Sequence, residues 1–266
     1  MTLTSYLSLE EMGLFIVEFN LKARSPVTVE NGDVIVDRGY STVTVRNVEA
    51  ASTDDAENKA RPKANAFLDE LCQQYEINLE IGNGWTVMLQ DSPATRHIKK
   101  YTLKTTLKGG HRRRIPHVLK EVEIRPSDAK TYYRKAVISK DPFDKFRNLY
   151  LAIENVASKI VVAKGKGSCG ELDLVRIALQ ECFSSNMQLL KEHSHVYSFE
   201  NTGDIFLDVA TFLYKKNRVQ LSHSKASKNK KIPFNPDHEW EVQVSLTLAE
   251  LVAESLLSYE DTHLLS

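Results

Sequence analysis

An arginine and a histidine near residue 220 are the residues of this chain best suited to chemistry on a phosphodiester. Arg218 and His223 stand five positions apart in the segment TFLYKKNRVQLSHSK. Arginine offers a permanently charged fork of donors that matches phosphate oxygens, and histidine accepts and donates a proton near neutral pH. RNA cleavage without a metal needs both functions, because the 2′-hydroxyl loses a proton, the leaving 5′-oxygen gains one, and the phosphate charge must be held. The pair therefore predicts metal-independent RNA cleavage with no cofactor.

The spacing of the pair sets a geometric condition on this hypothesis. Because each helical residue turns by about 100°, two residues five apart lie roughly 140° from each other around a helix. Arg218 and His223 share a face only if the helix ends or loosens near Ser222, or if a second copy of the helix completes the site. The alternative is structural, since basic residues near a helix C-terminus complement its dipole and cap its carbonyls.

A second signal for RNA is the basic stretch between residues 96 and 125. It contains ten Lys and Arg against Glu121 and Glu123, a composition that favours binding to a phosphate backbone. The predicted RNA-binding residues are Lys99, Lys104, Lys108, Arg112, Arg113 and Arg114, together with Lys225 just after the histidine. The alternative is a solvated hairpin whose charges keep an edge strand from aggregating.

The first half of the chain must position this basic stretch, and its patterns are mostly those of strands. Alternating apolar residues predict strands, and Asn-Gly and Gly-Asn-Gly predict tight turns. The expected strands are 13–23, 38–48, 101–107 and 118–124, with hairpins over 27–36 and 77–90. A helix capped by Ser52 or Thr53 is expected to run towards Tyr75 and to be kinked or restarted by Pro62.

The second half must position the arginine and the histidine, and its apolar residues recur at helical spacing. Asp141 and Pro142 are suited to the cap and first position of a helix that reaches about Ile160. The other expected helices cover 171–193, 204–222 and 240–258. We therefore expect an α+β protein with a strand-rich domain over residues 1–138 and an all-α bundle over residues 139–266.

Composition limits the class of protein only in part. Lys plus Arg and Asp plus Glu are both 35 among 266 residues, so net charge does not identify a partner. Three cysteines without a CxxC pair favour reduced thiols. No apolar run approaches the roughly 20 residues of a membrane span, and Glu10 and Glu11 are not typical of a signal peptide. We expect a cytoplasmic protein with no membrane partner.

Two helical segments together resemble the HEPN superfamily, and in particular its ApeA-like and MauJ-like branches. These are FRNLYLAIENV, with Glu154 as its acidic residue, and LYKKNRVQLSH, which contains an arginine and a histidine in the family's order. The resemblance covers about the last half of the chain. One departure is Val219, because active members commonly have a polar residue directly after the arginine.

The resemblance implies a helical bundle, a homodimer formed through that bundle, and an endoribonuclease of a defence or stress response. Its products would carry a 2′,3′-cyclic phosphate and a 5′-hydroxyl. The implied catalytic residues are Arg218, His223 and Glu154. The alternatives are a catalytically silent HEPN-like scaffold or regulator, which Val219 favours, and a MauJ-like accessory protein.

Overall fold

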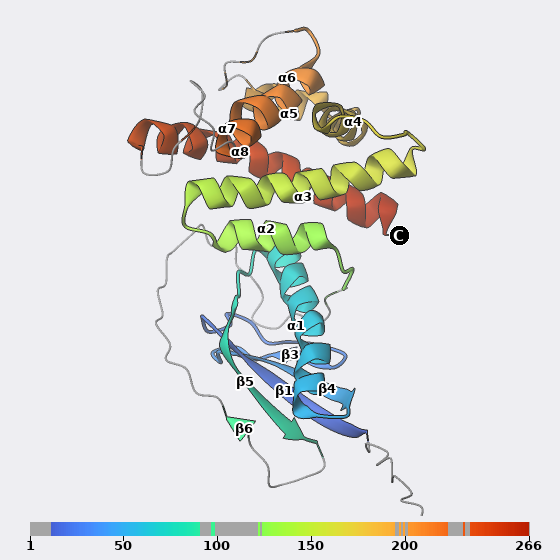
Figure 1. The fold of residues 1–266 in the computed structure, drawn as a ribbon, viewed down its shortest axis with the longest axis vertical. Helices are drawn as coiled ribbons and strands as arrows, with labels where there is room; N and C mark the ends of the chain where they lie inside the picture. The colour runs from blue at the N-terminus through green and yellow to red at the C-terminus, as the bar shows by residue number, and fades with distance from the viewer. Residues whose placement is uncertain are drawn as a thin grey trace, which may run out of the picture. The chain divides into compact units, whose positions relative to one another are not determined.

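The computed structural model describes residues 12–90, 97–98, 122, 124–194, 197, 199, 202–222, 231 and 235–265. The chain forms two compact units, Met1–Ile124 and Arg125–Ser266. The first contains an antiparallel sheet and one helix, and the second is helical (Figure 1). The expected α+β class, with strands first and helices after, is confirmed.

The first unit is built on a sheet with the strand order β2-β3-β4-β1-β5-β6. Its strands are β1 (Gly13–Leu21), β2 (Val29–Asn31), β3 (Val34–Val36), β4 (Thr42–Ala50), β5 (Ile81–Leu89) and β6 (His97–Ile98). Helix α1 (Thr53–Tyr75) packs across one face of this sheet (Figure 1). Because a strand points alternate side chains to opposite faces, every second residue of β1 from Phe15 to Leu21 is buried beneath the helix.

A β-bulge explains why the apolar pattern of β4 is not strictly alternating. Val45 and Val48 are both buried although they stand three positions apart. Between them the register against β1 shifts, and Asn47 adopts a left-handed φ of 52°. The extra residue of a bulge restores the inward direction of the following side chains.

The hairpin expected over residues 77–90 is wrong. Gly82, Asn83 and Gly84 lie inside the single strand β5, and neither glycine has a positive φ. The register against β1 shifts between the pairs Phe19–Trp85 and Leu21–Ile81. A bulge in a continuous strand therefore accommodates the two glycines, although their sequence is typical of a turn.

The helix α1 begins as expected and is not restarted at its proline. The Ser52 side chain accepts a hydrogen bond from the Asp55 amide at 3.1 Å, which satisfies one of the free donors of the first turn. The helix then continues through Pro62 as a single element of 23 residues. Burial of Phe67, Leu68 and Leu71 against the sheet offsets the missing backbone hydrogen bond of the proline.

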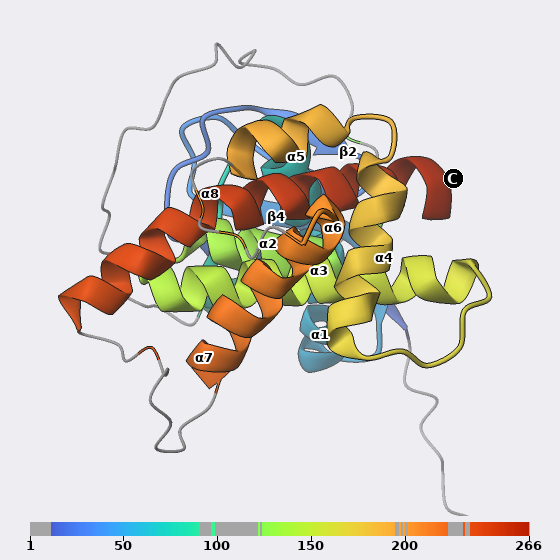
Figure 2. The same ribbon diagram turned by 90° about the horizontal axis from the view of Figure 1, so that it is seen from above.

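The helical unit is arranged around α3 (Pro142–Ala163), which packs against α2 (Asp128–Ile138), α4 (Glu171–Phe183) and α8 (Pro236–Tyr259) (Figures 1 and 2). The remaining elements are α5 (Met187–Ser194), α6 (Ile205–Thr211), the π-helical segment η1 (Phe212–Arg218), α7 (Val219–Ser222) and the π-helical segment η2 (Glu260–Leu264). The expected start of α3 is confirmed, because the Asp141 side chain accepts from the Asp144 amide at 2.8 Å and Pro142 follows as the first helical residue.

Three features of this unit differ from the sequence predictions. The helix α2 was not expected, and its packing on α3 makes the helical unit start at Arg125, before the expected boundary at residue 138. The helix expected over 171–193 is interrupted at Ser184–Asn186, where three residues that compete with helical hydrogen bonding follow one another. The last helix begins at Pro236, earlier than expected.

A buried carboxylate attaches the C-terminal segment to the rest of the helical unit. Glu260 is fully buried, accepts from the Ser127 hydroxyl at 2.8 Å and forms an ion pair with Lys159 of α3. Beside it the buried Lys130 amine lies 2.8 Å from an Asp261 carboxylate oxygen. Hydrogen bonds to a buried charge are stronger than neutral ones, so this network fixes η2 against α2 and α3.

We expect Glu260→Ala to lower the free energy of unfolding by about 1.5 to 3 kcal/mol, the range for a hydrogen bond to a charged group. Glu250→Ala is the matched control, because Lys145 of α3 pairs with Glu250 in the same way at a more exposed position. Exposed pairs contribute less than about 1 kcal/mol. Urea unfolding of both variants measures the difference, and equal losses would contradict the structural role of Glu260.

No helix in the described part of the chain combines the length and the apolar character that crossing a bilayer requires.

Candidate functional site

The helix that contains Arg218 changes its hydrogen-bond pattern just before that residue. Between α6 and α7 the segment η1 is π-helical, and the Val219 amide bonds to the Tyr214 carbonyl, five residues back. A π segment accommodates one more residue per turn than an α-helix and so rotates all later side chains by about 100°. Such segments occur frequently at functional sites. The face on which Arg218 lies is therefore set by η1.

The residue that holds this π segment is Asn217, whose side chain is fully buried. Its amide nitrogen donates to the Phe212 carbonyl at 3.0 Å. Its carbonyl oxygen accepts from the Lys231 amine at 2.8 Å and from the Ser245 hydroxyl of α8 at 3.1 Å. The Ser245 bond ties η1 to α8, the Lys231 bond ties it to the segment before α8, and the Phe212 bond lies within η1 itself. Together they satisfy the buried amide, which would otherwise carry a desolvation cost.

The Arg218 guanidinium lies over an aromatic ring and near a carboxylate. Its carbon Cζ is 5.8 Å from the centre of the Tyr150 ring on α3, within the range of a cation–π contact. Its Nε is 3.8 Å from an oxygen of Glu171, the first residue of α4, which is an ion-pair distance beyond hydrogen-bond range. The Arg218 side chain keeps 32% exposure.

Glu154 belongs to the same cluster. Partial burial raises its pKa, the nearby charge of Glu171 raises it further, and Arg218 acts in the opposite direction. Burial also raises the pKa of Tyr150, with Glu154 and Glu171 adding to the effect, so its hydroxyl stays protonated at neutral pH. That hydroxyl is buried and has no hydrogen-bond partner among the described residues. The cluster thus joins a guanidinium, a carboxyl with a raised pKa and a buried, protonated phenol.

The raised pKa of Glu154 predicts a dependence of stability on pH. The folded protein binds this proton more readily than the unfolded chain, so the group stabilises the fold most below the unfolded pKa near 4.5. That contribution disappears as the pH rises through the folded pKa. Glu154→Gln, which stays neutral, should therefore raise the melting temperature at pH 7 and give no advantage at acidic pH.

Thermal unfolding across pH measures this effect, and Glu181→Gln is a control of opposite sign. A hydrogen bond from Lys164 lowers the pKa of Glu181, so its charged form stabilises the fold above its unfolded pKa. Glu181→Gln should not raise the melting temperature at pH 7. A Glu154→Gln variant that melts at or below the wild-type temperature at pH 7 contradicts the raised pKa.

The predicted site residues fall into two groups. Arg218 and Glu154 come from separate helices and interact electrostatically. The helix continues through Ser222, and His223 lies outside the described residues. The same holds for the predicted RNA-binding residues Lys99, Lys104, Lys108, Arg112, Arg113, Arg114 and Lys225.

Two members of the cluster were not predicted as site residues. Tyr150 stands four residues before Glu154, a spacing that places the two side chains on one face of a helix. That spacing is the sequence signal that could have identified Tyr150 as a neighbour of Glu154. Glu171 gave none, because only the packing of α4 against α3 and η1 brings it to Arg218.

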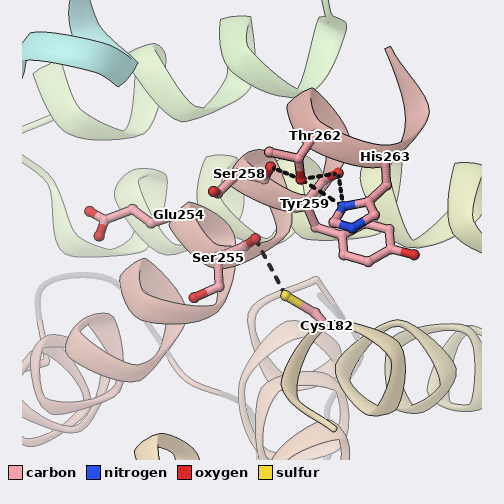
Figure 3. A pocket seen from close by; sticks show the side chains of 7 residues that line it. All are labelled: Cys182, Glu254, Ser255, Ser258, Tyr259, Thr262 and His263. Atoms are coloured by element: carbon pink, nitrogen blue, oxygen red, sulfur yellow. Dashed lines mark hydrogen bonds between the residues drawn. The ribbon is translucent and has the colours of Figure 1, made fainter. Parts of the chain in front are cut away.

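A larger hollow of about 410 Å³ lies elsewhere in the helical unit, between α4 and the C-terminal end of α8 (Figure 3). In it the His263 ring stacks on Tyr259 with centroids 4.3 Å apart, and the Cys182 thiol donates to the Ser255 carbonyl. Neither Arg218 nor Glu154 lines it. Size alone therefore does not identify the site, and the charged cluster at Arg218 is the stronger candidate.

Comparisons of the chain with models of protein families, with curated proteins and with solved structures gave no significant match. The interpretation of the site therefore depends on its residues and their geometry.

Proposed function

We propose that this protein acts on RNA through a HEPN-like helical unit, as a metal-independent endoribonuclease. The observation that supports the proposal most directly is the position of Arg218. Its guanidinium is partly exposed over Tyr150 and interacts with Glu154, and the chain reaches His223 five residues later. These are the functional groups that phosphodiester cleavage without a metal requires.

Each group has a defined role in the proposed reaction. Arg218 holds the phosphate oxygens as they gain charge, and His223 takes the proton of the 2′-hydroxyl and returns one to the leaving 5′-oxygen. Glu154 acts through the other two by orienting them and favouring their charged forms. The products carry a 2′,3′-cyclic phosphate and a 5′-hydroxyl.

The proposal includes a homodimer and an RNA-binding role for the basic stretch. Because α7 stays helical to Ser222, about 140° separates the directions of positions 218 and 223 along a regular helix. A second copy would supply the matching arginine or histidine. Lys99, Lys104, Lys108, Arg112, Arg113, Arg114 and Lys225 would hold the backbone of the substrate.

The test is to incubate the purified protein with end-labelled RNA in excess chelator. We expect cleavage with 2′,3′-cyclic phosphate and 5′-hydroxyl ends. A matched substrate with 2′-deoxy nucleotides should resist cleavage, because it lacks the attacking hydroxyl. Cleavage that appears only with magnesium, or that proceeds equally well on the deoxy substrate, contradicts the mechanism.

A catalytically silent HEPN-like scaffold is the second candidate function. Two observations favour it: Val219 follows the arginine, and Glu171 lies 3.8 Å from the guanidinium, where it competes with a phosphate. This function predicts a dimer that leaves RNA intact under all conditions. Sedimentation of the protein together with the cleavage assay separates the two functions, since only the endoribonuclease gives products.

A further inference from the structure

A small hollow beside Arg218 has the composition of a nucleotide site. Four of its residues come from adjacent turns of α3, and two come from η1 and α7 on the opposite wall. It encloses about 160 Å³ and is lined by Phe146, Arg147, Tyr150, Leu151, Arg218 and Leu221. We call it the Arg218 hollow. All six residues belong to the helical unit and to the described part of the chain.

The walls of the Arg218 hollow are apolar and aromatic. The Phe146 and Tyr150 rings lie at 19° to each other with centroids 6.4 Å apart, and Leu151 and Leu221 are partly exposed beside them. Phe146 and Tyr150 are 0% and 1% exposed, so a flat heterocycle placed here would make its accessible apolar contacts with Leu151 and Leu221. Apolar contact of this kind recognises nucleobases without strong dependence on sequence.

Two guanidinium groups add positive charge to the same hollow. Arg218 is held over Tyr150, and Arg147 is 62% exposed with its NH1 3.1 Å from Asp144 on the same helix. An exposed pair within one helix is weak, so Arg147 can turn to an anionic ligand at little cost. Arginine forks bind phosphate oxygens in pairs, which favours a phosphate at the edge of the hollow.

The volume limits the ligand to one ring system. Drug-sized ligands occupy pockets of roughly 300 Å³ or more, about twice the 160 Å³ found here. One nucleobase fits this space and a stacked dinucleotide does not.

The Tyr150 side chain in the wall of the hollow also has a buried hydroxyl without a hydrogen-bond partner among the described residues.

We propose that the Arg218 hollow binds a single nucleotide of single-stranded RNA, with the base among Phe146, Leu151 and Leu221 and the phosphate on Arg147 and Arg218. The choice of RNA rests on the proposed function. The binding itself does not require cleavage, because none of the six lining residues has to transfer a proton.

The experiment is calorimetric titration of the full chain with adenosine 3′-monophosphate, inorganic phosphate and adenosine. We expect the nucleotide to bind more tightly than either fragment. Arg218→Gln, which removes the fork, should weaken nucleotide binding at least about tenfold, the loss expected for a charge-assisted contact. Leu151→Trp should weaken it as well, because the larger side chain fills the space of the base.

Two control variants match these changes outside the hollow. Val162→Trp adds the same side chain to an exposed position of α3. Arg61→Gln removes an arginine that lies over the Phe19 ring and pairs with Glu57 in the first unit. Both controls should bind the nucleotide within about twofold of wild type. Thermal unfolding of each variant verifies that it is folded.

The outcomes separate this inference from the proposed function. Equal affinity for phosphate and nucleotide, no nucleotide binding, or unchanged binding in Leu151→Trp overturns the hollow as a nucleotide site, even if the protein cleaves RNA. Nucleotide binding that depends on Leu151 and Arg218 supports the site, even if the protein leaves RNA uncut and the proposed reaction fails.

Discussion

Replacing His223 with alanine is expected to slow RNA cleavage in chelator by about 10²- to 10⁴-fold, the usual contribution of a positioned acid–base group. The loss should fall on the chemical step, so single-turnover rates with saturating protein are the measurement. Binding of the uncut RNA should change little, because the proposed role of His223 is proton transfer, whereas Arg218 holds the phosphate.

His263→Ala is the control for this prediction. His263 belongs to the same helical unit, stacks on Tyr259 and lines the larger hollow (Figure 3). It has no part in the proposed reaction, so the variant should cleave at the wild-type rate. A His223→Ala protein that keeps its rate within a factor of two would remove His223 from the mechanism. A His263→Ala protein that also loses its rate would contradict the specific role of His223.

Replacing Arg218 with glutamine is the second large effect that we expect. Loss of a group that stabilises developing phosphate charge costs about 10²- to 10³-fold in the rate of the chemical step. Arg218→Lys should recover only part of the loss, because an ammonium keeps the charge but lacks the fork that binds two oxygens.

Arg61→Gln provides the matched comparison for Arg218→Gln. Both arginines lie over an aromatic ring and near a glutamate, with Arg61 4.8 Å from the Phe19 ring centre and Arg218 5.8 Å from that of Tyr150. The two substitutions therefore remove similar structural interactions. If both variants cleave RNA at the wild-type rate, the guanidinium of Arg218 has no catalytic role and the scaffold function is favoured.

The carboxylate of Glu171 is expected to affect RNA binding and the rate of RNA cleavage to different extents. Its carboxylate is close enough to Arg218 for an ion pair and too far for a hydrogen bond. A phosphate with good geometry can form shorter, charge-assisted bonds to the same guanidinium. Such a ligand would have to compete with Glu171, and this competition would lower affinity for RNA more than it would lower the rate once RNA is bound.

Local chemistry was sufficient to predict the elements whose signals lie within a few residues. The alternation of Phe15, Val17, Phe19 and Leu21 predicted β1 and its buried face, because the period of a strand is two residues. Asp141 and Pro142 predicted the start of α3, because a side-chain acceptor followed by proline satisfies the first turn of a helix.

Elements that depend on distant packing were missed for a common reason. Gly82 and Gly84 permit a turn, but the pairing of β5 with β1 keeps them extended. The helix α2 is stabilised by its contact with α3 and by the network around Glu260. In both cases the competing local preference is small compared with the burial gained in the folded chain.

The sequence by itself determined that an arginine and a histidine occur five positions apart after an apolar helical segment, and that Glu154 lies on an earlier helix. Only the tertiary structure decided where Arg218 is directed. The π-helical turn held by Asn217 directs the arginine to Tyr150 and Glu154 of α3 and to Glu171 of α4. That rotation depends on hydrogen bonds from Lys231 and Ser245, residues 14 and 28 positions away from Asn217, so no local pattern around Arg218 could reveal it.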